Sequence, residues 1–417
     1  MTLTSLGSLV PAARGRPGDD PIFALHAEAV RRAAAGESIL NATLGTLSTE
    51  DGRLAVMPSV LETLQRVQGE LVAGYSPVAG RPDFLAAVIR DVFGDGPLAE
   101  RAVAAATPGG TGAVYQAVVN FLEPGQKLLT TGYHWGPYPA IARNIGRDCE
   151  TFPMFRADRA FDVEALAAAL DRHVDTQGRA LVVLNDPCHN PTGYSLRQEE
   201  WRRVSEVLRR AGERAPVTVL LDVAYFPFGG ATARAWVNAI PALLSATTVL
   251  VAWTASKSFT QYGARVGAVV ALHKDDEERT QIKNALAYTC RATWSNSNHL
   301  GQRAVAELLT VPELRARADA ERDELIDLLG ARIEAFNAGA KSIRLNMPRY
   351  DSGFFVTVFT RDGQKAAAAM RDLGVYVLPM SGAVRVALCS TPLSEIPRLL
   401  DALEKGVAAG GSRQESS

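Results

Sequence analysis

The chain has 417 residues, of which 47% are hydrophobic and 21% charged, values typical of a globular protein with two or three domains. The formal net charge of −1 gives no electrostatic reason to expect nucleic acid or an anionic membrane as a partner. Four widely spaced cysteines form no CxxC pair, which argues against disulfides or a metal site and favours a reducing cytoplasm.

The first 20 residues, MTLTSLGSLVPAARGRPGDD, lack the apolar core of a signal peptide. No apolar run along the chain is long enough to span a bilayer. We therefore expect a cytoplasmic protein that makes no use of a membrane.

Between residues 100 and 275, short runs rich in valine and leucine alternate with helix-like stretches. These runs lack polar alternation, so they predict strands that are buried on both faces. Strands are expected at 101–106, 127–131, 180–186, 217–225, 247–254 and 265–272, and helices at 163–173 and 197–212. The pattern predicts an α/β domain built on a mostly parallel sheet.

The pattern changes after residue 300. A helical stretch over about 301–338 precedes a strand-like segment at 352–360, a helix-like segment at 365–374 and strand-like segments at 376–380 and 383–389. This order predicts a smaller α+β domain. We assign residues 1–52 to an N-terminal segment of the small domain, 53–300 to the large domain, 301–410 to the small C-terminal domain and 411–417 to a disordered tail.

Distinctive polar residues follow several of the predicted strands, at the sheet edge where open α/β domains bind ligands. In AAATPGGTGAVYQAV, the turn from strand to helix exposes the backbone N–H groups of Gly110, Thr111 and Gly112, which suits a phosphate. That signal is weak alone, because glycine-rich turns of this kind are common. Asn190 follows another strand, in the proline-bounded loop PCHNPTG.

Two further strands end on ionisable groups. Asp222 and Tyr225 end VTVLLDVAY, and a carboxylate at the end of a buried run needs a cationic partner. Lys257 follows TTVLVAWT and is one of only seven lysines among 44 basic residues. Arginine cannot lose its proton and form a covalent bond as a lysine amine can. A phosphate cradle, a carboxylate, a phenol, an amide and an amine together match the groups of pyridoxal 5'-phosphate (PLP).

The segments HNPTG (189–193), DVAY (222–225) and SK…GARVG (256–267) carry a family resemblance in their order and spacing. Through them the chain resembles a class I/II aminotransferase of fold type I, of the aspartate/aromatic aminotransferase group. The similarity extends from GTLSTEDG (45–52) to AVRVALC (383–389). It implies a PLP-dependent enzyme that exchanges an amino group between an α-amino acid, dicarboxylic or aromatic, and a 2-oxo acid through a lysine Schiff base.

The resemblance also implies how the cofactor is held. Lys257 would form the Schiff base and shuttle a proton, and Asp222 would pair with the pyridine nitrogen. Tyr225 and Asn190 would hydrogen-bond the phenolic oxygen, and Trp135 would stack on the ring unless it only packs beneath its loop. The phosphate would be bound by Gly110, Thr111, Thr254 and Arg265. Thr254 stands where many members have serine and keeps the hydroxyl.

The substrate residues follow from the same resemblance. Arg385 would bind the α-carboxylate, with Asn190 beside it, and Gly45 would let the backbone approach the substrate. Tyr75 would reach the partner subunit's phosphate, which implies a homodimer with shared active sites; otherwise it is a surface tyrosine. Arg291 lies where dicarboxylate-specific members carry an arginine that binds the distal carboxylate, again from the partner subunit. The family's Ser-Asn-Pro-Pro is here Ser295-Asn296-Ser297-Asn298, so Arg291 either binds substrate or is solvated.

Two other functions compete with transamination. The same cofactor site supports β/γ-elimination, replacement or carbon–carbon bond formation, as in relatives such as 1-aminocyclopropane-1-carboxylate synthase, for example in a specialised biosynthetic pathway. A regulatory protein with an aminotransferase-like domain would need a separate DNA-binding segment. The first 40 residues show no basic helix-turn-helix pattern, which disfavours that reading.

Overall fold

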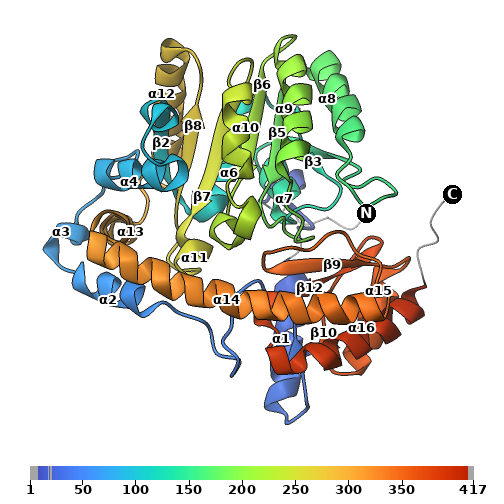
Figure 1. Ribbon diagram of the computed structural model, residues 1–417. Coiled ribbons are helices and arrows are strands. Elements are labelled where there is room, and N and C mark those ends of the chain that lie inside the picture. The colour runs from blue at the N-terminus through green and yellow to red at the C-terminus, as the bar shows by residue number, and fades with distance from the viewer. Residues whose placement is uncertain (1–7, 17, 19–20, 412–417) are drawn as a thin grey trace, which may run out of the picture.

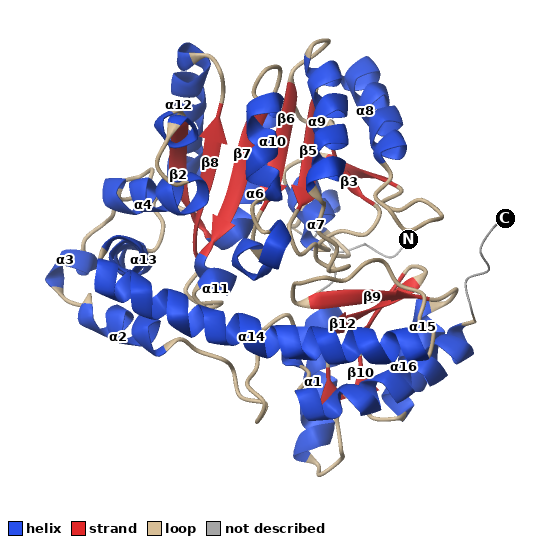
Figure 2. Ribbon diagram, viewed as in Figure 1, coloured by secondary structure: helices blue, strands red, loops and turns tan. Residues whose placement is uncertain are grey.

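The computed structural model describes residues 8–16, 18 and 21–411 (Figure 1). The predicted disordered tail lies outside these residues, apart from Gly411. A large sheet with helices on both faces stands above a smaller body made of short strands and helices, and the long helix α14 (Pro312–Ser342) runs along both (Figure 2). The assigned domain boundaries stay a prediction.

The large sheet is mostly parallel, as predicted. Its spatial order is β2 (Ala102–Pro108), β8 (Val266–Leu272), β7 (Thr248–Thr254), β6 (Val217–Asp222), β5 (Ala180–Asn185), β3 (Lys127–Thr131) and β4 (Asp148–Phe152). Only β8 runs against its neighbours, β2 and β7. The six expected strands are all present. The edge strand β4 escaped prediction because its sequence, DCETF, is only partly buried.

Alternate residues of each strand enter two different cores. In β6, for example, Val219 and Leu221 belong to one core and Leu220 to the other. The first core is covered by α4 (Pro82–Phe93), α8 (Val163–Gln177), α9 (Gln198–Gly212) and α10 (Ala235–Leu243). The second is covered by α6 (Gly109–Phe121), α7 (Pro137–Asn144) and α12 (Asp276–Thr293). Burial on both faces explains why these strands lack polar alternation.

The smaller body joins the two ends of the chain. Strand β1 (Leu40–Asn41) pairs in parallel with β10 (Val375–Tyr376). A second sheet has the order β11 (Leu378–Met380), β12 (Ala383–Ala387) and β9 (Phe355–Phe359), with antiparallel neighbours. Helices α1 (Pro21–Ala34), α15 (Gly363–Asp372) and α16 (Ile396–Gly410) complete it together with part of α14. The predicted strand at 376–380 is thus divided between β10 and β11.

The helical stretch expected over 301–338 is two helices rather than one. Helix α13 (His299–Thr310) ends before Pro312, which occupies the first turn of α14. Proline cannot donate the hydrogen bond that would continue α13, yet it suits the first turn of a new helix. The remaining helices are short: α2 (Pro58–Arg66), α3 (Glu70–Ala73), α5 (Pro97–Glu100), α11 (Ala255–Ser258), and the 3-10 turns Pro11–Ala13, Phe226–Phe228, Gly230–Thr232, Leu388–Ser390 and Leu393–Glu395.

Candidate active site

A cavity of about 540 Å³ lies at the carboxyl ends of β5, β6 and β7 and extends to residues of the smaller body. Eleven of the thirteen predicted site residues line it: Gly45, Gly110, Thr111, Trp135, Asn190, Asp222, Tyr225, Thr254, Lys257, Arg265 and Arg385. The topology explains this convergence, because parallel strands bring their carboxyl ends to one edge.

One end of the cavity is built to bind an anion. Helix α6 begins there, and the N–H groups of its first turn, including those of Gly110 and Thr111, have no intrahelical acceptor. The guanidinium of Arg265 lies beside this turn, donating to the Ser256 hydroxyl at 3.3 Å. A Cβ atom on Gly109 would lie 2.3 Å from Arg265 Nη2, so only glycine permits this approach. N–H groups, a hydroxyl and a cation therefore face the same space.

Lys257 lies in the single turn α11, directly after strand β7. Its Nζ is 4.7 Å from the ring centre of Tyr262 and 5.6 Å from that of Tyr225. Burial lowers the pKa of this amine from 10.5 to about 8, and the Arg265 cation acts in the same direction, while Cys389 and Asp222 oppose it. A sizeable share of Lys257 is therefore neutral near physiological pH and able to act as a nucleophile.

Asp222 ends strand β6 and is buried. Its Oδ2 accepts a hydrogen bond of 2.6 Å from the Tyr138 hydroxyl. Burial raises the pKa of Asp222, and the hydrogen bond from Tyr138 lowers it. Burial and the nearby Asp222 carboxylate raise the pKa of Tyr138 well above its ordinary value, so its hydroxyl keeps its proton and remains a donor.

The two strand ends β5 and β6 are tied together by Asn185. Its Nδ2 donates to the main-chain oxygen of Asp222 at 2.7 Å, and its Oδ1 accepts from the main-chain N–H of Asn190 at 2.6 Å. The Asn190 side chain lies 3.5 Å from the Tyr225 hydroxyl. Trp135 contacts Tyr138 edge-on, with ring centres 5.4 Å apart. The amide and phenol predicted to act together thus lie together.

The opposite side of the cavity carries Arg385, on strand β12. Its Nη2 donates to the Thr43 oxygen at 2.6 Å, its Nη1 lies 3.5 Å from Asn190 Oδ1, and its guanidinium stacks over the Phe355 ring at 4.4 Å. A Cβ atom on Gly45 would lie 2.2 Å from Phe355 Cζ, so glycine is required there. This fork, fixed on a rigid strand beside a close backbone approach, suits a carboxylate.

Tyr75 and Arg291 do not line the cavity of this chain. The side chain of Tyr75 is 92% exposed. Arg291 lies near the end of α12 and donates to the Ser295 hydroxyl at 2.6 Å. A contribution of either residue to a partner subunit's site, as the sequence suggests, stays a prediction.

Several residues in or behind the cavity wall escaped sequence reasoning. Tyr138, buried behind Asp222, contacts it across 84 positions of the chain, and only the aromatic-rich stretch YHWGPY hinted at it. Ser256, Tyr262 and Phe355 are part of the cavity wall itself. Ser256 and Tyr262 flank Lys257 in sequence and could have been inferred from that proximity, whereas Phe355 reads as an ordinary strand residue.

In the described part of the chain, no helix is long and apolar enough to cross a membrane. The same residues contain no group of three or more His, Cys, Asp or Glu side chains arranged to hold a metal ion.

Comparison of the sequence with known proteins identifies a family that it matches. The family model described as aminotransferase class I and II matches residues 38–403. An aromatic-amino-acid aminotransferase of Pseudomonas aeruginosa is 31% identical, over 89% of this chain and 92% of its own length. An aspartate aminotransferase of the same species is 26% identical, over 87% and 92%. The carbon–carbon bond-forming and elimination alternative finds no support in these comparisons.

Solved structures agree. An aminotransferase of Anaerococcus prevotii superposes with a TM-score of 0.89 at 30% identity, covering 96% of this chain and all, 100%, of its own. An aromatic-amino-acid aminotransferase of Burkholderia pseudomallei, covalently bound to pyridoxal phosphate, superposes with a TM-score of 0.76 at 26% identity, covering 98% and 100%.

Proposed function

The chain belongs to the class I and II aminotransferases and is a PLP-dependent enzyme that exchanges an amino group between an α-amino acid and a 2-oxo acid; from this premise we propose that its amino donor carries a large apolar, above all aromatic, side chain. We propose further that Lys257 is the residue that bonds to the cofactor aldehyde. The observation that carries the substrate proposal is the apolar lining of the cavity that also holds Arg385.

The residues of the cavity fit the cofactor at each of its functional groups. The first turn of α6 and Arg265 suit the phosphate, with a space that a Cβ atom on Gly109 would fill. Asp222, buried and anchored by Tyr138, suits a protonated ring nitrogen. Tyr225 and Asn190 suit the phenolic oxygen. When bound, PLP supplies an electron-withdrawing ring that makes the substrate α-carbon acidic.

Each of these residues has a defined task under this proposal. Lys257, neutral in part because burial lowers its pKa to about 8, would hold the cofactor at its aldehyde and, as a free amine, would move the substrate α-proton. Asp222 would keep a proton at the ring nitrogen. Arg385 holds the substrate α-carboxylate, and Trp135 limits the cavity on one side.

The apolar side chains that line the cavity favour an apolar substrate side chain. Phe355 lies under the guanidinium, and Leu44, Ile22 and Phe23 line the same cavity. Phe23 is 63% exposed in spite of its size, which leaves its ring available to cover a bound substrate. An aromatic ring packed here removes apolar surface from water, whereas a second carboxylate has no cation near it other than Arg385, Lys257 and Arg265, among the residues described.

The substrate proposal is tested by the visible spectrum of the holoenzyme with single amino acids and no oxo acid. Phenylalanine or tyrosine should bleach the bound cofactor at concentrations about tenfold or more below those needed for aspartate, and a 2-oxo acid should restore the spectrum. A lower half-bleaching concentration for aspartate would overturn the apolar preference. Borohydride reduction followed by peptide mass spectrometry tests the attachment separately, since cofactor mass on any peptide without Lys257 contradicts its role.

We propose a homodimer with shared sites because Tyr75 is exposed and does not line the cavity of its own chain, and Tyr288 on α12 is 78% exposed. Mixing Lys257→Ala protein with Tyr75→Ala protein tests this idea. Shared sites would form some intact sites in mixed dimers and recover activity that neither variant shows alone; a lack of recovery from demonstrated mixed dimers contradicts sharing. The four free cysteines fit a cytoplasmic location, which we also propose.

A further inference from the structure

Three charged residues of helix α14 connect this helix to the chain around Lys257. Arg315, Asp319 and Arg322 are spaced by four and three positions, so they lie on one face of the helix. Asp319 Oδ2 accepts a hydrogen bond of 2.7 Å from Arg315 Nε, and Asp319 Oδ1 accepts another from Arg322 Nη2. The three side chains therefore form one continuous ion-paired row.

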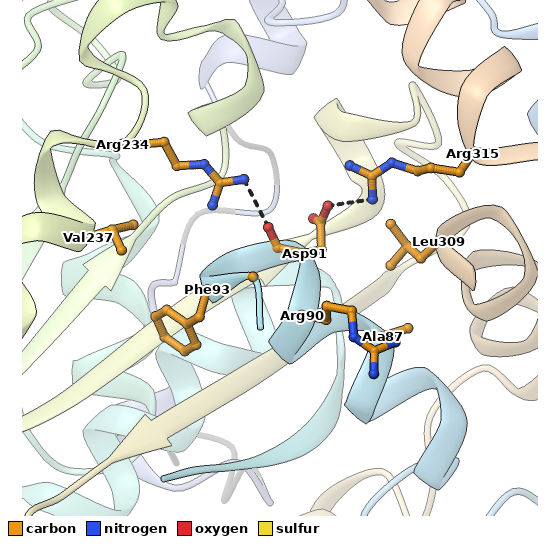
Figure 3. A pocket seen from close by; sticks show the side chains of 9 residues that line it. Ala87, Arg90, Asp91, Phe93, Arg234, Val237, Leu309 and Arg315 are labelled. Atoms are coloured by element: carbon orange, nitrogen blue, oxygen red, sulfur yellow. Dashed lines mark hydrogen bonds and ion pairs between the residues drawn. The ribbon is translucent and has the colours of Figure 1, made fainter. Parts of the chain in front are cut away.

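At Arg315, the row is linked to strand β7 through Asp91 on α4. Arg315 Nη1 donates to Asp91 Oδ1 at 2.9 Å, an ion pair visible in Figure 3. Asp91 Oδ2 accepts from Trp253 Nε1 at 3.0 Å. The Asp91 side chain is only 8% exposed, and Arg234 donates to its main-chain oxygen at 3.1 Å. Trp253 is thereby fixed four positions before Lys257.

At Arg322, the row contacts the chain on the C-terminal side of Lys257. Arg322 Nη1 donates to the main-chain oxygen of Ser258 at 3.2 Å, and its guanidinium lies 5.9 Å from the ring centre of Phe259. Ser258 is the last residue of α11, and carbonyl groups at a helix end lack intrahelical donors. A cation is the favourable partner for this end of a helix.

We propose that Arg322, held by Asp319, is a positioning residue for Lys257. Its Ser258 contact and the Asp91–Trp253 contact fix the reactive segment on both sides, so the amine has one direction in the cavity. Arg322 touches neither cofactor nor substrate; it acts through the backbone of α11. The inference rests on the proposed role of Lys257.

The same helix reaches the carboxylate-binding side of the cavity. Arg332 is buried and donates to the main-chain oxygens of Ser48 and Cys389, three and four residues from Gly45 and Arg385. Its guanidinium also pairs with Glu50. One rigid helix thus sets the positions of both the amine and the segments that hold the substrate carboxylate, and a shift of either relative to the other would degrade the reactive geometry.

Three variants test the proposal: Arg322→Met, Arg322→Lys and Asp319→Asn. Arg317→Met is the matched control, because Arg317 lies on the same helix and pairs with Glu62 at 2.9 Å on the surface. In the holoenzyme, Arg322→Met should lower kcat by about tenfold while KM for the amino acid changes less. Arg317→Met should keep the wild-type kcat.

A second readout uses the apoenzyme and does not depend on turnover. The rate of reductive methylation of Lys257, followed by peptide mass spectrometry, gives the pKa of its amine. A loosened segment is better hydrated, so this pKa should rise in Arg322→Met from about 8 toward its ordinary value. Arg322→Lys keeps the cation but not the fork, so positioning predicts a rise there too, whereas a pure charge effect predicts none.

The groups that face the Lys257 amine are Asp222, Arg265, Cys389, Tyr225 and Tyr262, and none of the variants replaces them. If Arg322→Met does not fold, Arg322→Lys and Asp319→Asn carry the test. A wild-type pKa of Lys257 in Arg322→Lys, or wild-type pKa and kcat in Arg322→Met or in Asp319→Asn, would overturn the inference. Absence of cofactor on Lys257 in the wild-type protein would instead overturn the proposed function, so the two failures are distinguishable.

Discussion

Replacing Tyr138 with phenylalanine tests how the hydrogen bond to Asp222 affects cofactor binding. The Tyr138 hydroxyl donates to Asp222 Oδ2 at 2.6 Å, and both side chains are buried. A hydrogen bond to a charged group contributes about 1.5–3 kcal/mol. If this contribution is lost in full, cofactor binding weakens by about ten- to hundredfold. Titration of the apoenzyme with PLP, followed by tryptophan fluorescence, measures the change in Kd.

The pH dependence of this Kd gives the sign of the effect. Burial has already raised the pKa of Asp222, and loss of the Tyr138 hydrogen bond raises it further. The ionised carboxylate exists above this pKa and is lost as the pH falls through it. Cofactor affinity of Tyr138→Phe should therefore begin to fall at a higher pH than wild-type affinity, in a titration from about pH 8 to about pH 5.

Tyr194→Phe is the matched control for this prediction. The Tyr194 hydroxyl also donates to a carboxylate, that of Glu200, but the pair lies outside the active-site cavity. Both variants should lower the Tm, because each leaves a carboxylate without one donor. Only Tyr138→Phe should change cofactor affinity. A wild-type Kd and pH profile in Tyr138→Phe would refute the reasoning.

Three further predictions concern the same cavity. Lys257→Ala should abolish turnover and leave PLP bound without a covalent bond, measured by its release on denaturing gel filtration; turnover at the wild-type rate would remove Lys257 from its role. Gly45→Ala should cost about 1–3 kcal/mol of stability in thermal unfolding and raise KM, because its Cβ would lie 2.2 Å from Phe355 Cζ. PLP attachment to the apoenzyme should accelerate as the pH rises through about 8 and level off at higher pH, where most of the Lys257 amine is neutral; a flat pH profile would contradict the lowered pKa.

The large sheet could be predicted because its strands carry their evidence locally. Strands β5 and β6 are apolar throughout, and burial on both faces demands that pattern. Strand β4 sits at the sheet edge, where half-exposed residues such as Asp148 and Glu150 are allowed, and a local pattern cannot distinguish it from a loop. Pro312 marked the break between α13 and α14, but helix periodicity on both sides of it obscured that signal.

The residues of the candidate active site likewise differ in how clearly the sequence marks them. Residues that we propose contact the cofactor carry distinctive chemistry at strand ends, so motifs in the sequence could predict that Asp222, Asn190 and Lys257 line one cavity. The residues that orient these side chains carry no recognisable signal in the sequence. Tyr138 becomes informative only when the fold brings it to Asp222, and Asn185 only when β5 pairs with β6. Arg322 reaches Ser258 across 64 positions, a contact that no local pattern encodes.

The presence of a single lysine in the cavity lining also has a structural reason. The other six lysines are all exposed, whereas burial lowers the pKa of Lys257, the amine that we propose must lose its proton. Strand β7 leads into Lys257, and β8 returns antiparallel with Thr254 opposite Gly267, which brings Arg265 back to the start of α6. The amine of Lys257 and the cation that we propose binds the phosphate are thus placed by one strand pairing. A residue inserted between Lys257 and Arg265 would lengthen the connection without changing the pairing of β7 with β8. Arg265 would therefore keep its position, and the strain would fall on α11, the turn whose Ser258 oxygen Arg322 contacts.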